Sequence, residues 1–104
     1  MITADFFKKS GKLCGFRISG HSGYAESGSD IVCAAVSAMV RLTVNTVSGR
    51  FAAESHTEVN EENAEIGFSF EPGGENAELL VQGLKDELTA RARESPKYIR
   101  VVQH

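Results

Sequence analysis

The run from Ile31 to Ser48, IVCAAVSAMVRLTVNTVS, decides the fold class of this chain. Its β-branched residues would suit a strand over any short window. Its eighteen residues contain neither glycine nor proline, which is long for a strand, and Gly49 follows as a typical helix terminator. Ser29 and Asp30 precede it as candidate N-cap residues. The run therefore predicts a helix that begins at Ile31.

The polar residues of this predicted helix form one narrow stripe. They are spaced by four, four and three residues, at Ser37, Arg41, Asn45 and Ser48. The rest of the helix surface is apolar. We therefore expect most of it to be buried, either against a sheet or partly in a second subunit.

Segments on both sides of this helix alternate between apolar and polar residues, as strands do. The expected strands are Ile2 to Lys8, Leu13 to Ser19, Phe51 to Val59, Ala64 to Phe70 and Tyr98 to Gln103. A second helix is predicted where apolar residues recur at helical spacing, at Ala77, Leu80, Val81, Leu84, Leu88 and Ala92. The order β-β-α-β-β-α-β predicts an α+β fold, a two-layer sandwich in which two helices cover one face of a mostly antiparallel sheet.

Length and composition predict a single domain over residues 1–104. The hydrophobic fraction of 41% and the charged fraction of 24% are ordinary for a soluble globular protein. The net charge of −3 argues against broad binding to a phosphate backbone. We therefore expect no direct nucleic-acid partner.

The sequence also favours a cytoplasmic protein that does not bind a membrane. The N-terminus, MITADFFKKSGK, lacks the long apolar stretch of a secretory signal. The longest apolar stretch, Ile31 to Val40, is followed by Arg41, so we expect it to be too short to span a bilayer. In the cytoplasm, Cys14 and Cys33 are expected to be free thiols.

The segment before the predicted helix has the composition of a loop and carries a histidine. Gly20 to Ser29 holds three glycines and three serines, and it leads into the helix that carries Cys33. If Asp30 is the N-cap, Cys33 lies in the first turn, where free backbone N–H groups favour a negative charge on the sulfur and could form an oxyanion hole. Asp30 opposes that charge, whereas His21 could accept the thiol proton.

Five further residues are candidates for substrate binding or for support of the site: Gly20, Ser22, Tyr24, Asp30 and Ser37. Tyr24 could contact a peptide, and Ser37 lies one helical turn from Cys33. An inert interpretation stands beside the functional one. Free cysteines are often buried for packing alone, and a histidine in a polar loop is usually just solvated.

Three stretches carry a family resemblance. Gly20-His21, together with the run Ser29-Asp30-Ile31-Val32-Cys33-Ala34-Ala35-Val36-Ser37-Ala38, resembles the ribosomal-processing cysteine protease family, called Prp. The closing Tyr98-Ile99-Arg100-Val101-Val102 is also similar to the last strand of that family, and the length matches. Ser22 stands where the family more often has alanine.

The resemblance implies a small cytoplasmic cysteine endopeptidase with a Cys–His dyad, in which His21 is the base and Cys33 the nucleophile. Its substrate would be the N-terminal extension of a large-subunit ribosomal protein precursor, removed during ribosome maturation. The resemblance also implies a homodimer.

Two other functions remain open. A non-catalytic ribosome-associated module could use the same loop to hold a peptide without cutting it. A thiol redox protein could use Cys14 to resolve an oxidised Cys33, although Cys14 is expected in the core and no C-x-x-C is present.

The remaining polar clusters predict less. We expect no metal and no cofactor, because His21, Cys33, His56 and His104 show no paired-ligand spacing. His56 is expected to be exposed, and His104 to lie in a frayed terminus. The acidic stretch from Glu54 to Glu65 is expected to be a solvated hairpin face, which could steer a basic substrate.

Overall fold

The computed structural model describes residues 1–20, 27–62, 64–71 and 75–104, with the backbone alone for residues 27–30. The elements follow the order β1 (Ile2–Lys9), β2 (Lys12–Ser19), α1 (Ser27–Asn45), a π-helical turn (Thr46–Arg50), β3 (Ser55–Asn60), β4 (Glu65–Phe70), α2 (Glu75–Glu94) and β5 (Ile99–Gln103). The predicted α+β order is confirmed.

The five strands form one mixed sheet with the order β3-β4-β2-β1-β5. Three pairings are antiparallel, and β1 pairs with β5 in parallel. The parallel pair arises because α2 carries the chain back across the sheet before β5 begins. The prediction of a mostly antiparallel sheet is therefore confirmed, with one parallel edge.

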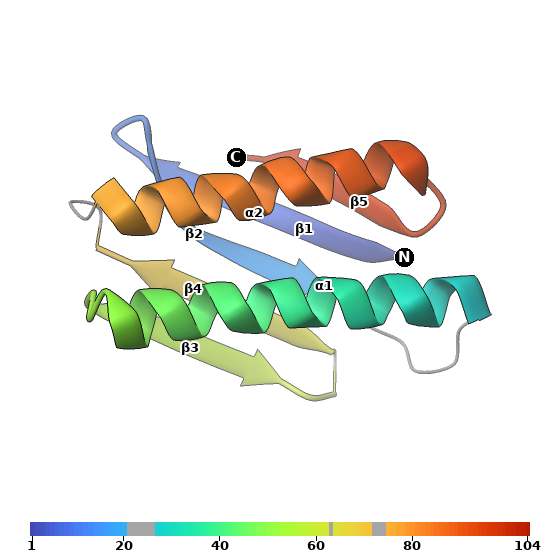
Figure 1. Cartoon of the computed structure of the whole chain (residues 1–104), viewed down its shortest axis with the longest axis horizontal. Helices are drawn as coiled ribbons and strands as arrows, with labels where there is room; N and C mark the ends of the chain where they lie inside the picture. The colour runs from blue at the N-terminus through green and yellow to red at the C-terminus, as the bar shows by residue number, and fades with distance from the viewer. Residues whose placement is uncertain (21–26, 63, 72–74) are drawn as a thin grey trace.

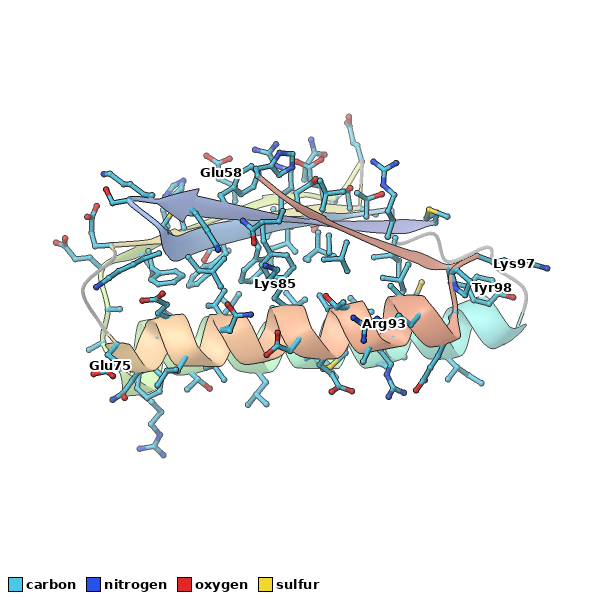
Figure 2. All side chains as sticks on the ribbon, turned by 90° about the horizontal axis from the view of Figure 1, so that it is seen from above. Glu58, Glu75, Lys85, Arg93, Lys97 and Tyr98 are labelled. Carbon is cyan, nitrogen blue, oxygen red and sulfur yellow. The ribbon has the colours of Figure 1, made fainter. Side chains whose placement is uncertain are left out.

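Both helices lie on the same face of the sheet and run in opposite directions (Figure 1). Figure 2 shows the two layers from the side, with side chains filling the space between them. Phe6, Phe16 and Phe68 form the middle of that space, with ring centroids 5.9 Å apart for the first pair and 5.5 Å for the second. Val36 and Val40 of α1 are buried against the same core. The helix-covered face is therefore the apolar one.

The predicted start of α1 is wrong. The helix begins at Ser27, four residues before Ile31. Ser27, Ser29 and Asp30 are all common residue types at a helix start. The spacing of apolar residues does not indicate which of them begins the helix. The helical backbone also passes the expected terminator, because a π-helical turn includes Gly49 and ends at Arg50.

By length and composition alone, the helical segment Ile31–Arg50 could cross a membrane. The expectation of a stretch too short to span a bilayer concerned Ile31 to Val40 alone, and the apolar helical segment is longer than that stretch. One side of the segment packs on the sheet, since Val36, Val40 and Val47 are fully buried or nearly so.

Strand β3 is shorter than predicted. It begins at Ser55 rather than at Phe51, and Ala52 has a φ of 48°, which interrupts an extended backbone. All six residues of β3 are exposed, and the strand forms one edge of the sheet. The expectation of a solvated acidic hairpin is confirmed for this strand.

Candidate functional site

Cys33 lies on α1 with a free, half-buried thiol and packs against the core. It is six residues after Ser27, the first residue of the helix. The backbone N–H groups without an intrahelical acceptor belong to the first turn, so they precede Cys33 by about one turn. The prediction that Cys33 occupies the first turn, with those N–H groups around its sulfur, is therefore wrong.

Cys33, Ser37 and Arg41 are four residues apart and therefore lie along one flank of α1. Ser37 is half-buried and Arg41 is exposed. Both line a cavity of about 320 Å³. Cys33 lies one helical turn before Ser37, about 6 Å closer to the N-terminal end of α1. The thiol is thus one turn from the end of this cavity.

The cavity lies between α1 and the hairpin formed by β3 and β4. We call it the α1–hairpin groove. The residues that line it are Ser37, Val40, Arg41, Val59, Asn60, Glu61, Ala64, Glu65 and Ile66. Figure 2 shows Glu58 on the sheet face away from the helices. Its neighbour Val59 therefore points toward the helix side, since successive strand residues alternate between faces. The hairpin supplies much of the apolar wall of the groove.

Carboxylates surround the outer end of the hairpin. Glu58, Glu61, Glu62 and Glu65 line an open hollow of about 740 Å³ together with Arg17. Arg17 forms an ion pair with Glu65, at 3.2 Å between Nε and Oε1. This rim would attract a cation, and it borders the groove because Glu61 and Glu65 line both.

Gly20 has a structural reason to be glycine. It follows the last residue of β2 with a φ of +92°, a region that residues with a side chain rarely adopt. A Cβ atom at this position would collide with the backbone carbonyl oxygen of Met1. Gly20 therefore sets the direction in which the chain leaves β2.

Replacing Gly20 with alanine is expected to lower the free energy of unfolding by about 2–3 kcal/mol, because both the backbone strain and the collision with Met1 must be relieved. Urea denaturation measures this. Gly83→Ala is the matched control, since an added Cβ there meets nothing within 4 Å in helix α2. It should raise the stability by about 0.5–1 kcal/mol. Equal stabilities for the two variants would contradict this role for Gly20.

The structure does not test every candidate. His21, Ser22 and Tyr24 lie outside the described residues, as does the side chain of Asp30. Ser37 is confirmed as a neighbour of Cys33 along the helix. Sequence analysis missed Arg41, Val59 and Ile66 as lining residues, because no local signal indicates which face of α1 the hairpin approaches.

Cys14 and His104 are placed differently from expectation. Cys14 is half-buried outside the core cluster, with its Sγ 3.6 Å from the carbonyl oxygen of Phe7. His104 is not frayed: its Nε2 lies 2.8 Å from Asp5 Oδ1 and its ring stacks on Phe7. Sequence cannot show the contacts of His104, because β5 pairs with β1 from the far end of the chain.

The prediction for His56 can be compared with the structure directly. His56 is exposed as expected and pairs with Glu58 at 3.0 Å between Nε2 and Oε1. Within the described ranges, no group of three or more potential ligands gathers in a way that could hold a metal ion.

Comparisons with known proteins agree along the whole chain. A family model described as cysteine protease Prp matches residues 1–100. The ribosomal processing cysteine protease Prp of Bacillus subtilis (strain 168) is 31% identical over 107 residues, which cover 97% of this chain and 96% of that protein.

Two solved structures have the same fold. SMU.848 from Streptococcus mutans superposes with a TM-score of 0.90 at 26% identity, covering 99% of this chain and 96% of that one. The essential ribosomal processing protease Prp from S. aureus, in complex with a covalently linked product peptide, gives a TM-score of 0.87 at 25% identity with both chains fully covered.

Proposed function

The chain belongs to the Prp family of cysteine proteases, and we propose that it removes the N-terminal extension of a large-subunit ribosomal protein with Cys33 as nucleophile and His21 as general base. The observation that carries this proposal is the position of the thiol. Cys33 is half-buried on a rigid helix, one turn from a groove large enough for a peptide side chain. The relatives are named for ribosomal processing, and one was solved with a covalently linked product peptide.

The dyad would work in two steps. The imidazole of His21 accepts the thiol proton of Cys33, and the thiolate attacks the carbonyl carbon of the scissile bond. When the tetrahedral intermediate collapses, the C–N bond breaks, the imidazolium returns the proton to the leaving amine, and a thioester to Cys33 remains. The imidazole then takes a proton from water, whose oxygen attacks the thioester carbonyl carbon. When this second tetrahedral intermediate collapses, the C–S bond breaks, the imidazolium returns its proton to the sulfur of Cys33, and the carboxylic acid product leaves.

The α1–hairpin groove supports an extended peptide as substrate. Val40, Val59 and Ile66 give it apolar walls that suit an apolar side chain of the substrate. The carboxylates around the hairpin end would attract basic residues next to that segment. An N-terminal segment of a ribosomal protein precursor, presented as an extended chain, fits this combination. The proposal also includes a cytoplasmic location and a homodimer.

The test is to incubate the protein with a ribosomal protein precursor and follow the precursor mass. We expect the mass to fall by that of the extension. Val59→Glu should lower kcat/KM about 10-fold, because it places a charge in the apolar wall of the groove. Leu79→Glu is the control of similar exposure on α2, outside the groove, and should keep the wild-type kcat/KM.

One outcome would contradict the proposed cleavage, and another would contradict the role of the groove. A precursor that binds but keeps its mass would assign the chain to the non-catalytic peptide-binding class. Unchanged cleavage by Val59→Glu would remove the groove from the substrate path and leave the dyad to be tested separately.

A further inference from the structure

Strand β3 has an open backbone edge. It ends the sheet on one side, with β4 as its one neighbour among the described residues, and Figure 1 shows it along the outer border. Its six exposed residues run in regular register with β4. Natural edge strands are often protected by a proline, a bulge or a covering segment, and the described residues provide β3 with none of these. An edge of this kind can bind a further strand.

The register shows which backbone groups face outward. The N–H of Glu71 donates to the carbonyl oxygen of Glu54 at 3.1 Å, so this opposite pair is hydrogen-bonded. Along an antiparallel ladder, hydrogen-bonded pairs alternate with pairs that are not. The residues of β3 that bond to β4 are therefore every second one, namely His56, Glu58 and Asn60. The residues that direct their N–H and C=O groups to the outer edge are Ser55, Thr57 and Val59.

The side chains along this edge differ between the two sides of the sheet. Val59 lines the α1–hairpin groove on the helix side, and Thr57 lies on the same side two residues earlier. Glu58 lies on the side away from the helices, where it pairs with His56 (Figure 2). A strand added to the edge would place its own side chains beside those of β3 on the same sides. Apolar residues would suit the helix side, and basic residues would suit the side of Glu58.

The charge around the hairpin selects the charge of such a strand. The glutamates of β3, β4 and the residues next to them are Glu54, Glu58, Glu61, Glu62, Glu65 and Glu71. Within the part of the chain that the structure describes, only Glu58 and Glu65 of this group form ion pairs, with His56 and Arg17. The excess of negative charge attracts a basic segment and repels an acidic one.

We propose that the outer edge of β3 binds an extended segment of alternating apolar and basic residues, which adds a strand to the sheet. Backbone hydrogen bonds from Ser55, Thr57 and Val59 hold the segment, and the hairpin carboxylates select its charge. Val59 belongs both to this edge and to the α1–hairpin groove, so a chain bound here can continue into the groove. In one respect the inference rests on the proposed function: the segment belongs to the precursor, outside the residues around the scissile bond.

Amide hydrogen exchange followed by NMR tests the edge without any cleavage, in the Cys33→Ala protein. In the free protein, the amides of Ser55, Thr57 and Val59 should exchange fast, whereas that of His56 should be protected by β4. An alternating lysine–valine octapeptide at millimolar concentration should slow exchange at the three outward amides at least about 10-fold. The glutamate–valine octapeptide is the matched control and should leave them unchanged.

Three results of this experiment would overturn the proposal. The first is unchanged exchange at the outward amides with the lysine–valine peptide. The second is equal protection by both octapeptides, since the charge of the hairpin would then select nothing. The third is protection that rises with protein concentration in the absence of peptide, which would assign the edge to a second copy of the chain.

Thr57→Pro removes one outward N–H and leaves the ladder to β4 intact. Proline is tolerated on an edge strand where its missing N–H would face solvent. His56→Pro is the matched control, because it removes an N–H that bonds to β4. Thr57→Pro should therefore unfold near the wild-type urea midpoint, and His56→Pro at a clearly lower urea concentration. Equal losses of stability would show that the N–H of Thr57 does not face outward.

Cleavage kinetics link the edge to the substrate. Thr57→Pro should raise KM for the precursor about 10-fold with kcat near the wild-type value, because the edge holds the chain away from the reacting bond. A short peptide that spans only the scissile bond should be cleaved equally well by both proteins. A folded Thr57→Pro protein with the wild-type KM for the precursor would overturn the inference. If wild-type protein cleaves nothing, the proposed function fails, and the octapeptide experiment still decides whether the edge binds a basic strand.

Discussion

Cys33→Ala is expected to lower the rate of precursor cleavage by at least about 10³-fold, because no other group in the proposed mechanism can form the thioester. The substitution removes one half-buried sulfur atom from a helix, and alanine is the best helix former, so the fold should be retained. Binding of the precursor should also be retained, since the walls of the groove are unchanged. Mass spectrometry of the precursor measures cleavage, and fluorescence anisotropy of a labelled peptide measures binding.

Cys14→Ser is the control for this variant. Cys14 is also a free, half-buried thiol, but it lies on β2 and contacts a backbone carbonyl of β1. Its replacement should leave cleavage at the wild-type rate. A redox mechanism in which Cys14 resolves Cys33 predicts the opposite, namely that both variants lose activity. Residual cleavage by Cys33→Ala within a few-fold of wild type would remove Cys33 as the nucleophile.

His21→Ala is expected to lower kcat by about 10²–10⁴-fold, the usual contribution of a general base. The thiol would then lack a proton acceptor, and the leaving amine would lack a proton donor. KM should change little, because His21 is assigned to proton transfer rather than to the groove. Cleavage kinetics over a range of precursor concentrations separate the two parameters.

The experiment can also distinguish a catalytic from a structural role. A loss of activity through misfolding would appear in the urea denaturation curve of His21→Ala, whereas a loss of the base would not. If His21→Ala cleaves as fast as wild type, the dyad is wrong even though the family assignment stands.

Much of the fold was predictable because its signals are local. Alternating apolar residues in β1, such as Ile2, Ala4 and Phe6, are all buried on the helix side as the pattern predicts. The second helix was equally clear, since Ala77 and Leu88 recur at helical spacing and are buried. Patterns of this kind depend only on which side of an element meets the core.

The boundaries were less predictable because several residues compete for the same role. Ser27, Ser29 and Asp30 all suit a helix start, and the choice among them moved Cys33 out of the first turn. At the other end, Gly49 did not stop the helix, because the chain continues through a π-helical turn. Tertiary packing overrides such local preferences.

Like the fold, the candidate site has one part that the sequence predicts and one part that it does not. The spacing of Cys33 and Ser37 on one helical flank follows from the sequence, since residues four apart lie on the same side. The apolar groove beside them does not, because Val59 and Ile66 reach it from a hairpin distant in the chain. The exposure of Ile31 and Leu42 on α1 also required the structure, which shows which apolar residues the sheet leaves uncovered.

The central claim is that His21 activates the sulfur of Cys33, and the alkylation rate of that sulfur tests it most directly. Limited iodoacetamide treatment at pH 7, followed by peptide mapping, compares Cys33 with Cys14, which is also half-buried, in a single sample. The account predicts that Cys33 reacts at least about 10-fold faster than Cys14, and that the difference disappears in His21→Ala. Equal rates for the two thiols in the wild-type protein, or a fast Cys33 that does not depend on His21, would contradict it.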